Sequence, residues 1–413
     1  MVLHQPFFDV LSAEQIGSAE WSAALAGLVV LRLVDSARAD SSVIDADWTG
    51  LRAATDSVNA MREGTPLRRR LTRIMDELRN PDGTLASVND HIFAYGRALD
   101  TDGHWQLAAD VFATVAEIAR AEKTPEVAME ATIALGGTAR RCGDWELSAS
   151  GYAEAAHFAD ALDDKASGLT VRVGTANTQI ARGNIPAAQS ILDEVIDAAT
   201  ASGFDGVLAI ALHSRATASH LRGNYHEAVK LGYEALEKTT NPNQKDAVMA
   251  DVAAALAELG ILNAARDAHM IISLTSRYQW VRWQATINLM ELASMEGMEG
   301  PFEEYARELR NAALDPKLRS YFLLYYGQGL VSFGRDEEGR KYICEALEFA
   351  SKSKINQVAS EAEQALKLAA TKRPAEPKKA WVESVPDDLV YVTAGLAQLR
   401  ESAALAAPTP EWT

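Results

Sequence analysis

The sequence predicts an all-α protein, an α-solenoid of about seven or eight stacked helical hairpins. Three observations carry this prediction. Small residues stand at fixed distances on both sides of a recurring glycine. Only eight of the 13 prolines fall within the first 373 residues, which favours long helices because proline disrupts a helix interior. The glycine itself recurs every 37 to 40 residues, at Gly64, Gly103, Gly143, Gly183, Gly223, Gly260, Gly297 and Gly334.

Each recurring glycine is expected to close one helix and to allow a tight turn into the next. Glycine adopts left-handed backbone conformations without strain, so it suits this position. The fifth residue after the glycine is small, as Ala108 is after Gly103 and Ala228 after Gly223. Small side chains let two helix backbones approach closely. Such a hairpin cannot bury its apolar face alone, so it must stack on its neighbours.

The pattern around these turns resembles the tetratricopeptide repeat (TPR) family. The segment from Gly136 through Gly143 and Trp145 to Tyr152 matches the family's order of small, turn-glycine and aromatic positions. The turn in residues 222–228 matches best. The family repeats about every 34 residues, so a period of 37 to 40 is similar to its longer-period arrays. The resemblance implies a right-handed solenoid over residues 45–370.

Residues 1–44 are expected to form a helical cap on the first hairpin. One or two helices are predicted within residues 12–40, with Ser12 and Ser18 as N-caps because their hydroxyls can accept a hydrogen bond from the first helical turn. A separate small signalling domain is the alternative interpretation of this segment.

A linker and one further helix are predicted after the solenoid. Residues 371–386 read as a linker because prolines and like charges resist packing. Residues 387–405 read as a helix, and residues 406–413 as a tail. We expect the helix to fold back and cover the apolar face of the terminal repeat; exchange between two chains, giving a homodimer, and docking on a client are the alternatives. Its apolar stripe consists of Leu389, Val392, Leu396 and Leu399.

The composition argues against several classes of partner and location. The net charge is −17, with 40 basic and 57 acidic residues, which disfavours nucleic-acid binding along the chain. The basic cluster at residues 68–73 is expected to be a solvated helix face. The start of the chain lacks the positive residues of a signal peptide, and no apolar run is long enough to span a membrane. We therefore expect a cytoplasmic protein.

The sequence offers no motif for catalysis, and we expect neither enzymatic activity nor a cofactor or metal. His213 and His220 lie two helical turns apart, too far for both to ligate one metal ion. The cysteines Cys142 and Cys344 form no CxxC pair, which excludes a zinc ribbon.

The TPR resemblance implies which residues would meet a client. In that family the first helix of each hairpin faces inward, and fixed positions before the turn glycine point into the groove. Asn177 matches an inward asparagine that holds a peptide backbone, although the basic partners of a carboxylate clamp are missing beside it. Most of the negative charge lies within residues 89–370, which favours a client with a basic segment. The candidate residues are Arg97, Arg140, Arg141, Asn177, His213, Thr217 and His220.

A second candidate interface is aromatic. Trp280 and Trp283 fall on the first helix of one hairpin, and Tyr321 and Tyr325 fall on the first helix of the next. Exposed Trp and Tyr side chains are typical anchors of protein interfaces. This surface is a candidate for partner docking or homodimerisation.

Together these features predict a non-enzymatic scaffold or adaptor that binds a protein or peptide client. The alternative is a peptide-sensing regulatory protein whose repeat array controls an effector or a transcription factor.

Overall fold

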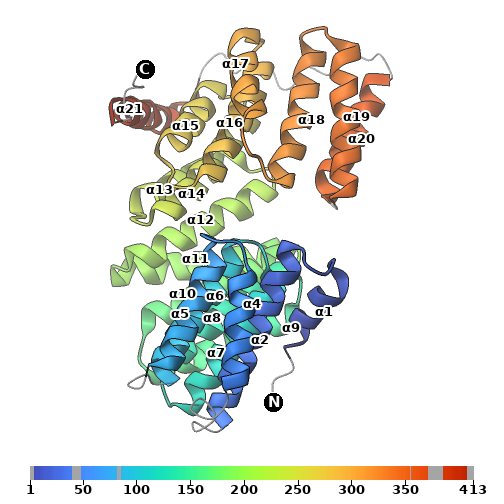
Figure 1. Ribbon diagram of the computed structural model, residues 1–413. Coiled ribbons are helices and arrows are strands. Elements are labelled where there is room, and N and C mark those ends of the chain that lie inside the picture. The colour runs from blue at the N-terminus through green and yellow to red at the C-terminus, as the bar shows by residue number, and fades with distance from the viewer. Residues whose placement is uncertain (1–3, 40–47, 81–84, 354, 371–384, 407–413) are drawn as a thin grey trace. The chain divides into compact units, whose positions relative to one another are not determined.

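The computed structural model describes residues 4–39, 48–80, 85–353, 355–370 and 385–406, and every regular element within these ranges is helical. The chain divides into two compact units, Met1–Val195 and Ile196–Thr413, which are described separately (Figure 1). The all-α fold class predicted from the sequence is confirmed.

The helices pair into hairpins along the chain. The first unit contains α1 (Gln5–Ala13), α2 (Ala19–Ala39), α4 (Trp48–Ala60), α5 (Pro66–Arg79), α6 (Leu85–Thr101), α7 (Trp105–Ala121), α8 (Pro125–Cys142), α9 (Trp145–Ala161) and α10 (Lys165–Ala181). Helix α11 (Ile185–Ser202) continues into the second unit. The second unit then contains α12 (Asp205–Leu221), α13 (Tyr225–Lys238), α14 (Pro242–Glu258), α15 (Leu262–Thr275), α16 (Gln279–Met295), α17 (Glu299–Arg310), α18 (Pro316–Ser332), α19 (Asp336–Lys352), α20 (Asn356–Ala370), the 3-10 turn η1 (Asp387–Leu389) and α21 (Val390–Ala406).

All eight recurring glycines lie in left-handed turns, with φ between +71° and +82°. At Gly223, the backbone N–H donates to the His220 carbonyl at 2.9 Å, and the next N–H donates to the Ser219 carbonyl at 2.9 Å. These bonds satisfy carbonyls that the end of α12 would otherwise leave unpaired. The predicted helix–turn–helix units are therefore confirmed.

The small residues beside the turns bring the two helices of a hairpin together. A Cβ atom built on Gly339 would lie 2.6 Å from the Gly327 carbonyl oxygen, so the backbones of α18 and α19 are in contact. Ala108 and Ala265 occupy the position of Gly339 in other hairpins and are fully buried. Consecutive helices also contact one another from α5 to α10 and from α12 to α17.

The N-terminal helices pack on the body of the first unit. Helix α1 contacts α2 and α7, and Phe7 is fully buried between them and the core. The buried His4 ring joins three segments, because Nδ1 lies 2.6 Å from Asp110 Oδ2 and Nε2 lies 3.2 Å from Asp35 Oδ2.

One of the two predicted N-caps is correct. Ser18 Oγ accepts a hydrogen bond from the Trp21 N–H at 3.1 Å at the start of α2. The prediction for Ser12 is wrong, because α1 begins at Gln5 and Ser12 lies near its end, donating to the Phe8 carbonyl. Pro6 in the first turn explains the earlier start, since proline is well tolerated there.

Helix α21 folds back on the second unit, but it does not cover the terminal hairpin. It packs on α13 and α15, as Figure 1 shows for α15, so the expected cover of the last repeat is wrong. Leu389, Val392 and Leu396 are fully buried there, whereas Leu399 remains 42% exposed. The predicted linker up to residue 384 and the tail from residue 407 lie outside the described residues.

Specific contacts explain why α21 lies on these two helices. Asp388 contacts His226 Nε2 at 2.9 Å and Lys230 Nζ at 2.7 Å on α13. Arg400 Nη1 lies 2.9 Å from Asp267 Oδ1 on α15. Charged contacts near both ends of α21 thus align its buried apolar stripe.

Candidate functional site

The predicted client-binding residues lie on the first helices of their hairpins, namely α6, α8, α10 and α12. We call the surface formed by first helices within each unit the first-helix face. The residues differ in whether their polar groups already have partners within the structure.

Two of the arginines on the first unit's face already have intramolecular partners. The Arg97 guanidinium lies 5.0 Å from the Phe93 ring centroid, a cation–π contact that leaves its N–H groups facing solvent. Arg141 forms an ion pair with Asp100 on the neighbouring hairpin. Its charge is therefore largely neutralised, and its main role in this structure is to join α6 and α8.

Arg140 and Tyr152 are hydrogen-bonded to each other, and Asn177 lies on the next first helix, α10. Tyr152 extends from α9 towards the gap between α8 and α10, where its hydroxyl lies 3.4 Å from a Cβ built on Gly137. Burial raises the pKa of Tyr152, and the Arg140 charge opposes this shift. Arg140 Nε is buried without a hydrogen-bond partner. The half-buried Asn177 amide makes no hydrogen bond within the described residues.

In the second unit, the candidate residues meet an acidic side chain. His213 Nε2 donates to Asp251 Oδ2 at 2.8 Å, which joins α12 to α14. Thr217 Oγ1 donates to the His213 carbonyl at 3.1 Å. The His220 ring makes an edge contact with the Tyr225 ring, with centroids 5.1 Å apart.

A hollow of about 90 Å³ opens between α12, α13 and α14. It brings two predicted residues, Thr217 and His220, together with Asp251, which the sequence analysis missed. The missed signal is the repeat itself. Asp251 follows His213 by 38 residues, about one period, so polar side chains that can bond to each other and stand one repeat apart indicate neighbours on adjacent hairpins. The hollow is lined by Ala216, Thr217, His220, Leu221, Ala228, Gly232, Asp251, Val252 and Ala254.

The aromatic candidates are divided between surface and core. Trp280 is 53% exposed, as the interface hypothesis requires. Trp283, Tyr321 and Tyr325 instead pack, half-buried, against the core of α16–α20. Burial raises the pKa of Tyr325, with nearby Glu291 adding to the shift. Most of this predicted interface therefore stabilises the fold.

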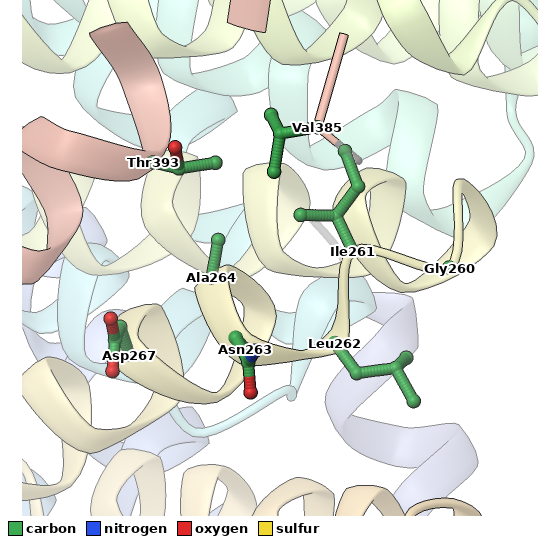
Figure 2. A pocket seen from close by; sticks show the side chains of 8 residues that line it. All are labelled: Gly260, Ile261, Leu262, Asn263, Ala264, Asp267, Val385 and Thr393. Carbon is green, nitrogen blue, oxygen red and sulfur yellow. The ribbon is translucent and has the colours of Figure 1, made fainter. Parts of the chain in front are cut away.

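A larger hollow, of about 270 Å³, lies beside α21 (Figure 2). Val385 and Thr393 lie on one side of it, and residues 260–264 and Asp267 of the α14–α15 turn and α15 lie on the other. Because Asp267 is already paired with Arg400, the polar lining offers few groups to a ligand. The hollow follows from the docking of α21 and contains none of the predicted residues.

Within the described part of the chain, no group of three or more His, Cys, Asp or Glu side chains is arranged to hold a metal ion. None of the helices in that part is long and apolar enough to cross a bilayer. Burial raises the pKa of the Cys142 thiol, which disfavours the reactive thiolate.

No protein-family model and no curated protein matches the chain. Among solved structures, it is similar to NprR bound to its cognate peptide NprX, with 13% identity, a TM-score of 0.48, and coverage of 82% of this chain and 96% of NprR. It is also similar to the apo form of the quorum sensor NprR from B. thuringiensis (13% identity, TM-score 0.43, 86% and 87% coverage). A Rap protein complexed with Competence and Sporulation Factor matches with 13% identity, a TM-score of 0.37, and 86% and 100% coverage. Similarity at this level assigns neither a family nor a ligand.

Proposed function

We propose that this chain is a non-enzymatic adaptor built of TPR units, and that it binds a peptide or an extended protein segment on its first-helix face. The observation that carries the proposal is the polar chemistry that the fold leaves unused there. A buried donor without a partner, such as Arg140 Nε, costs about 1–3 kcal/mol. Because this atom is shielded from solvent, a ligand recovers that free energy only if the Arg140 side chain turns towards it on binding.

An extended peptide suits these groups well. Each peptide unit offers one donor and one acceptor, and the Asn177 side chain can satisfy both at once. The second unit offers its own place for a ligand side chain, in the hollow between α12, α13 and α14. As the sequence favours, we also propose that the protein is cytoplasmic and that its client has a basic segment.

The test is selection from a displayed library of random dodecapeptides on the purified full chain. We expect the wild type to enrich peptides, and the double variant Arg140→Ala/Asn177→Ala to bind them at least about tenfold more weakly. The matched control is Arg120→Ala, on the second helix of its hairpin, where Arg120 pairs with Glu154. If no peptide is enriched, or if the double variant binds as well as the wild type, the proposal is wrong.

A regulatory variant of this function is supported by α21. Contacts to exposed charged groups hold it at its N-terminal end, so a bound client could release it and offer α13 and α15 to an effector. Hydrogen exchange separates the two versions. A regulator would lose protection in α21 when an enriched peptide binds, whereas a simple adaptor would keep it.

The exposed Trp280 supports a second contact surface, which includes the homodimer alternative. Light scattering on the wild type and on Trp280→Ala tests this. A dimer that becomes a monomer in the variant supports the surface, and a monomeric wild type removes the homodimer.

A further inference from the structure

The hollow between α12, α13 and α14 exists because many of the residues that line it have small side chains or none. Gly232 has no side chain, and a Cβ built there would lie 2.6 Å from Val252 Cγ2. The Val252 side chain of α14 occupies that place, so α13 approaches α14 closely and Val252 forms part of the floor of the hollow. Ala216, Ala228 and Ala254 add only methyl groups to its lining.

The size and lining of the hollow restrict what it can hold. An engineered apolar cavity of about 150 Å³ accepts benzene, so a hollow of about 90 Å³ holds less of an aromatic ring than of a short aliphatic side chain. The volume suits a valine or leucine side chain. Leu221 at the edge is 58% exposed, and it would cover part of such a side chain.

One side of the hollow carries a negative charge. The Asp251 side chain is 55% exposed, and its Oδ2 accepts from His213. Its Oδ1 makes no hydrogen bond within the described residues, so it can accept one from a ligand. A lysine or arginine beside the aliphatic residue of a ligand would reach this oxygen.

We propose that this hollow is the specificity pocket of the second unit's first-helix face, and that it selects a peptide in which a valine or leucine stands close to a lysine or arginine. The aliphatic side chain fills the space between Ala216, Ala228 and Ala254, and the cation pairs with Asp251. This inference rests on the proposed peptide-binding function.

The library selection described above tests the motif directly. We expect the enriched peptides to share an aliphatic residue with a basic residue one or two positions away. Ala254→Leu fills the hollow from an exposed position and should weaken binding by about 10–100-fold, the value of burying one leucine-sized side chain. Ala247→Leu is the matched control, because it makes the same change on the exposed face of α14 two turns away; it should bind like the wild type.

Asp251→Asn keeps the shape and removes the charge. It should weaken binding by about two- to fivefold, and the difference from wild type should shrink at high salt. Enriched peptides that lack the motif, or that bind Ala254→Leu as well as the wild type, overturn the pocket but leave peptide binding intact. A wild type that enriches no peptide overturns the proposed function itself.

Discussion

At the scale of single residues, His4 shows how one side chain can hold a helix. It is almost completely buried and lies between carboxylates from α2 and α7. Burial alone would lower its pKa, but the hydrogen bonds and charges of Asp110 and Asp35 outweigh it and raise the pKa to about 9. The protonated imidazole therefore fastens the start of α1 to the first unit.

This raised pKa predicts a loss of stability in alkaline solution. The folded pKa of about 9 exceeds the unfolded value of 6.5, so the stabilisation is fully present below pH 6.5 and disappears as the pH rises through 9. A shift of this size corresponds to about 3 kcal/mol. Melting temperatures of the wild type and His4→Gln, measured from pH 6 to pH 10, should differ most at pH 6. A constant difference across this range would show that His4 carries no charge-dependent contact.

A matched pair of glycines tests the turns. Gly223 has a φ of +77°, whereas Gly206 lies near the start of α12 outside the left-handed region, and an added Cβ meets no atom within 4 Å at either site. Gly223→Ala should cost about 1–2 kcal/mol through left-handed strain. Gly206→Ala should instead gain about 0.5–1 kcal/mol, because alanine favours the helix. Thermal unfolding followed by circular dichroism measures both, and equal effects would contradict the assigned turn.

The sequence predicted the positions of the site residues better than their availability. The repeat places Arg140 and Arg141 side by side, but it does not reveal that Arg141 pairs with Asp100 while Arg140 Nε stays unpaired. Position follows from helix periodicity, which is local. Pairing depends on which charges the next hairpin presents, and that becomes visible only when residues one period apart are compared.

At the scale of elements, α21 again shows that the sequence predicts local features but not contacts between distant residues. Its apolar stripe could be predicted from the sequence because helix periodicity is local, and three of the four residues of the stripe are buried. The helices on which it packs could not be predicted from the sequence, because Asp267 lies 133 residues from Arg400 and Asp388 lies 158 residues from Lys230. No sequence pattern links such distant residues without the folded surface between them.

At Gly395, α21 lies so close to Tyr233 of α13 that an added side chain should displace the helix. A Cβ there would collide with the Tyr233 hydroxyl, so Gly395→Val should separate α21 from α13. Ala394→Val makes a similar change at the neighbouring, exposed position and serves as the control. Hydrogen exchange should speed up in α21 and α15 in the first variant only. Unchanged protection in Gly395→Val would mean that α21 does not depend on this close contact.

At the scale of the whole molecule, helices mostly contact their neighbours in the chain. In repeat proteins of this kind, stability is approximately a sum of local terms. Damage to one hairpin should therefore remain local, unlike damage to the core of a globular domain, which lowers protection everywhere.

Phe302 provides the test. It is fully buried, stacked on Tyr326 at 5.3 Å and in contact with Phe333 at 5.2 Å. Phe302→Ala should cost about 3–5 kcal/mol. Native-state hydrogen exchange should accelerate in α16–α19, with no change in α7–α9. Equal acceleration in both regions would show that the molecule unfolds as a single cooperative body.

The return of α21 to α15 also has a consequence during protein synthesis. Asp267 leaves the ribosome 133 residues before Arg400, which corresponds to roughly 7–27 s at about 5–20 residues per second. Throughout that interval the nascent chain carries α13 and α15 but not yet the helix that covers them. A chaperone or partner that recognises this bare surface meets no competition from the chain itself until translation reaches α21.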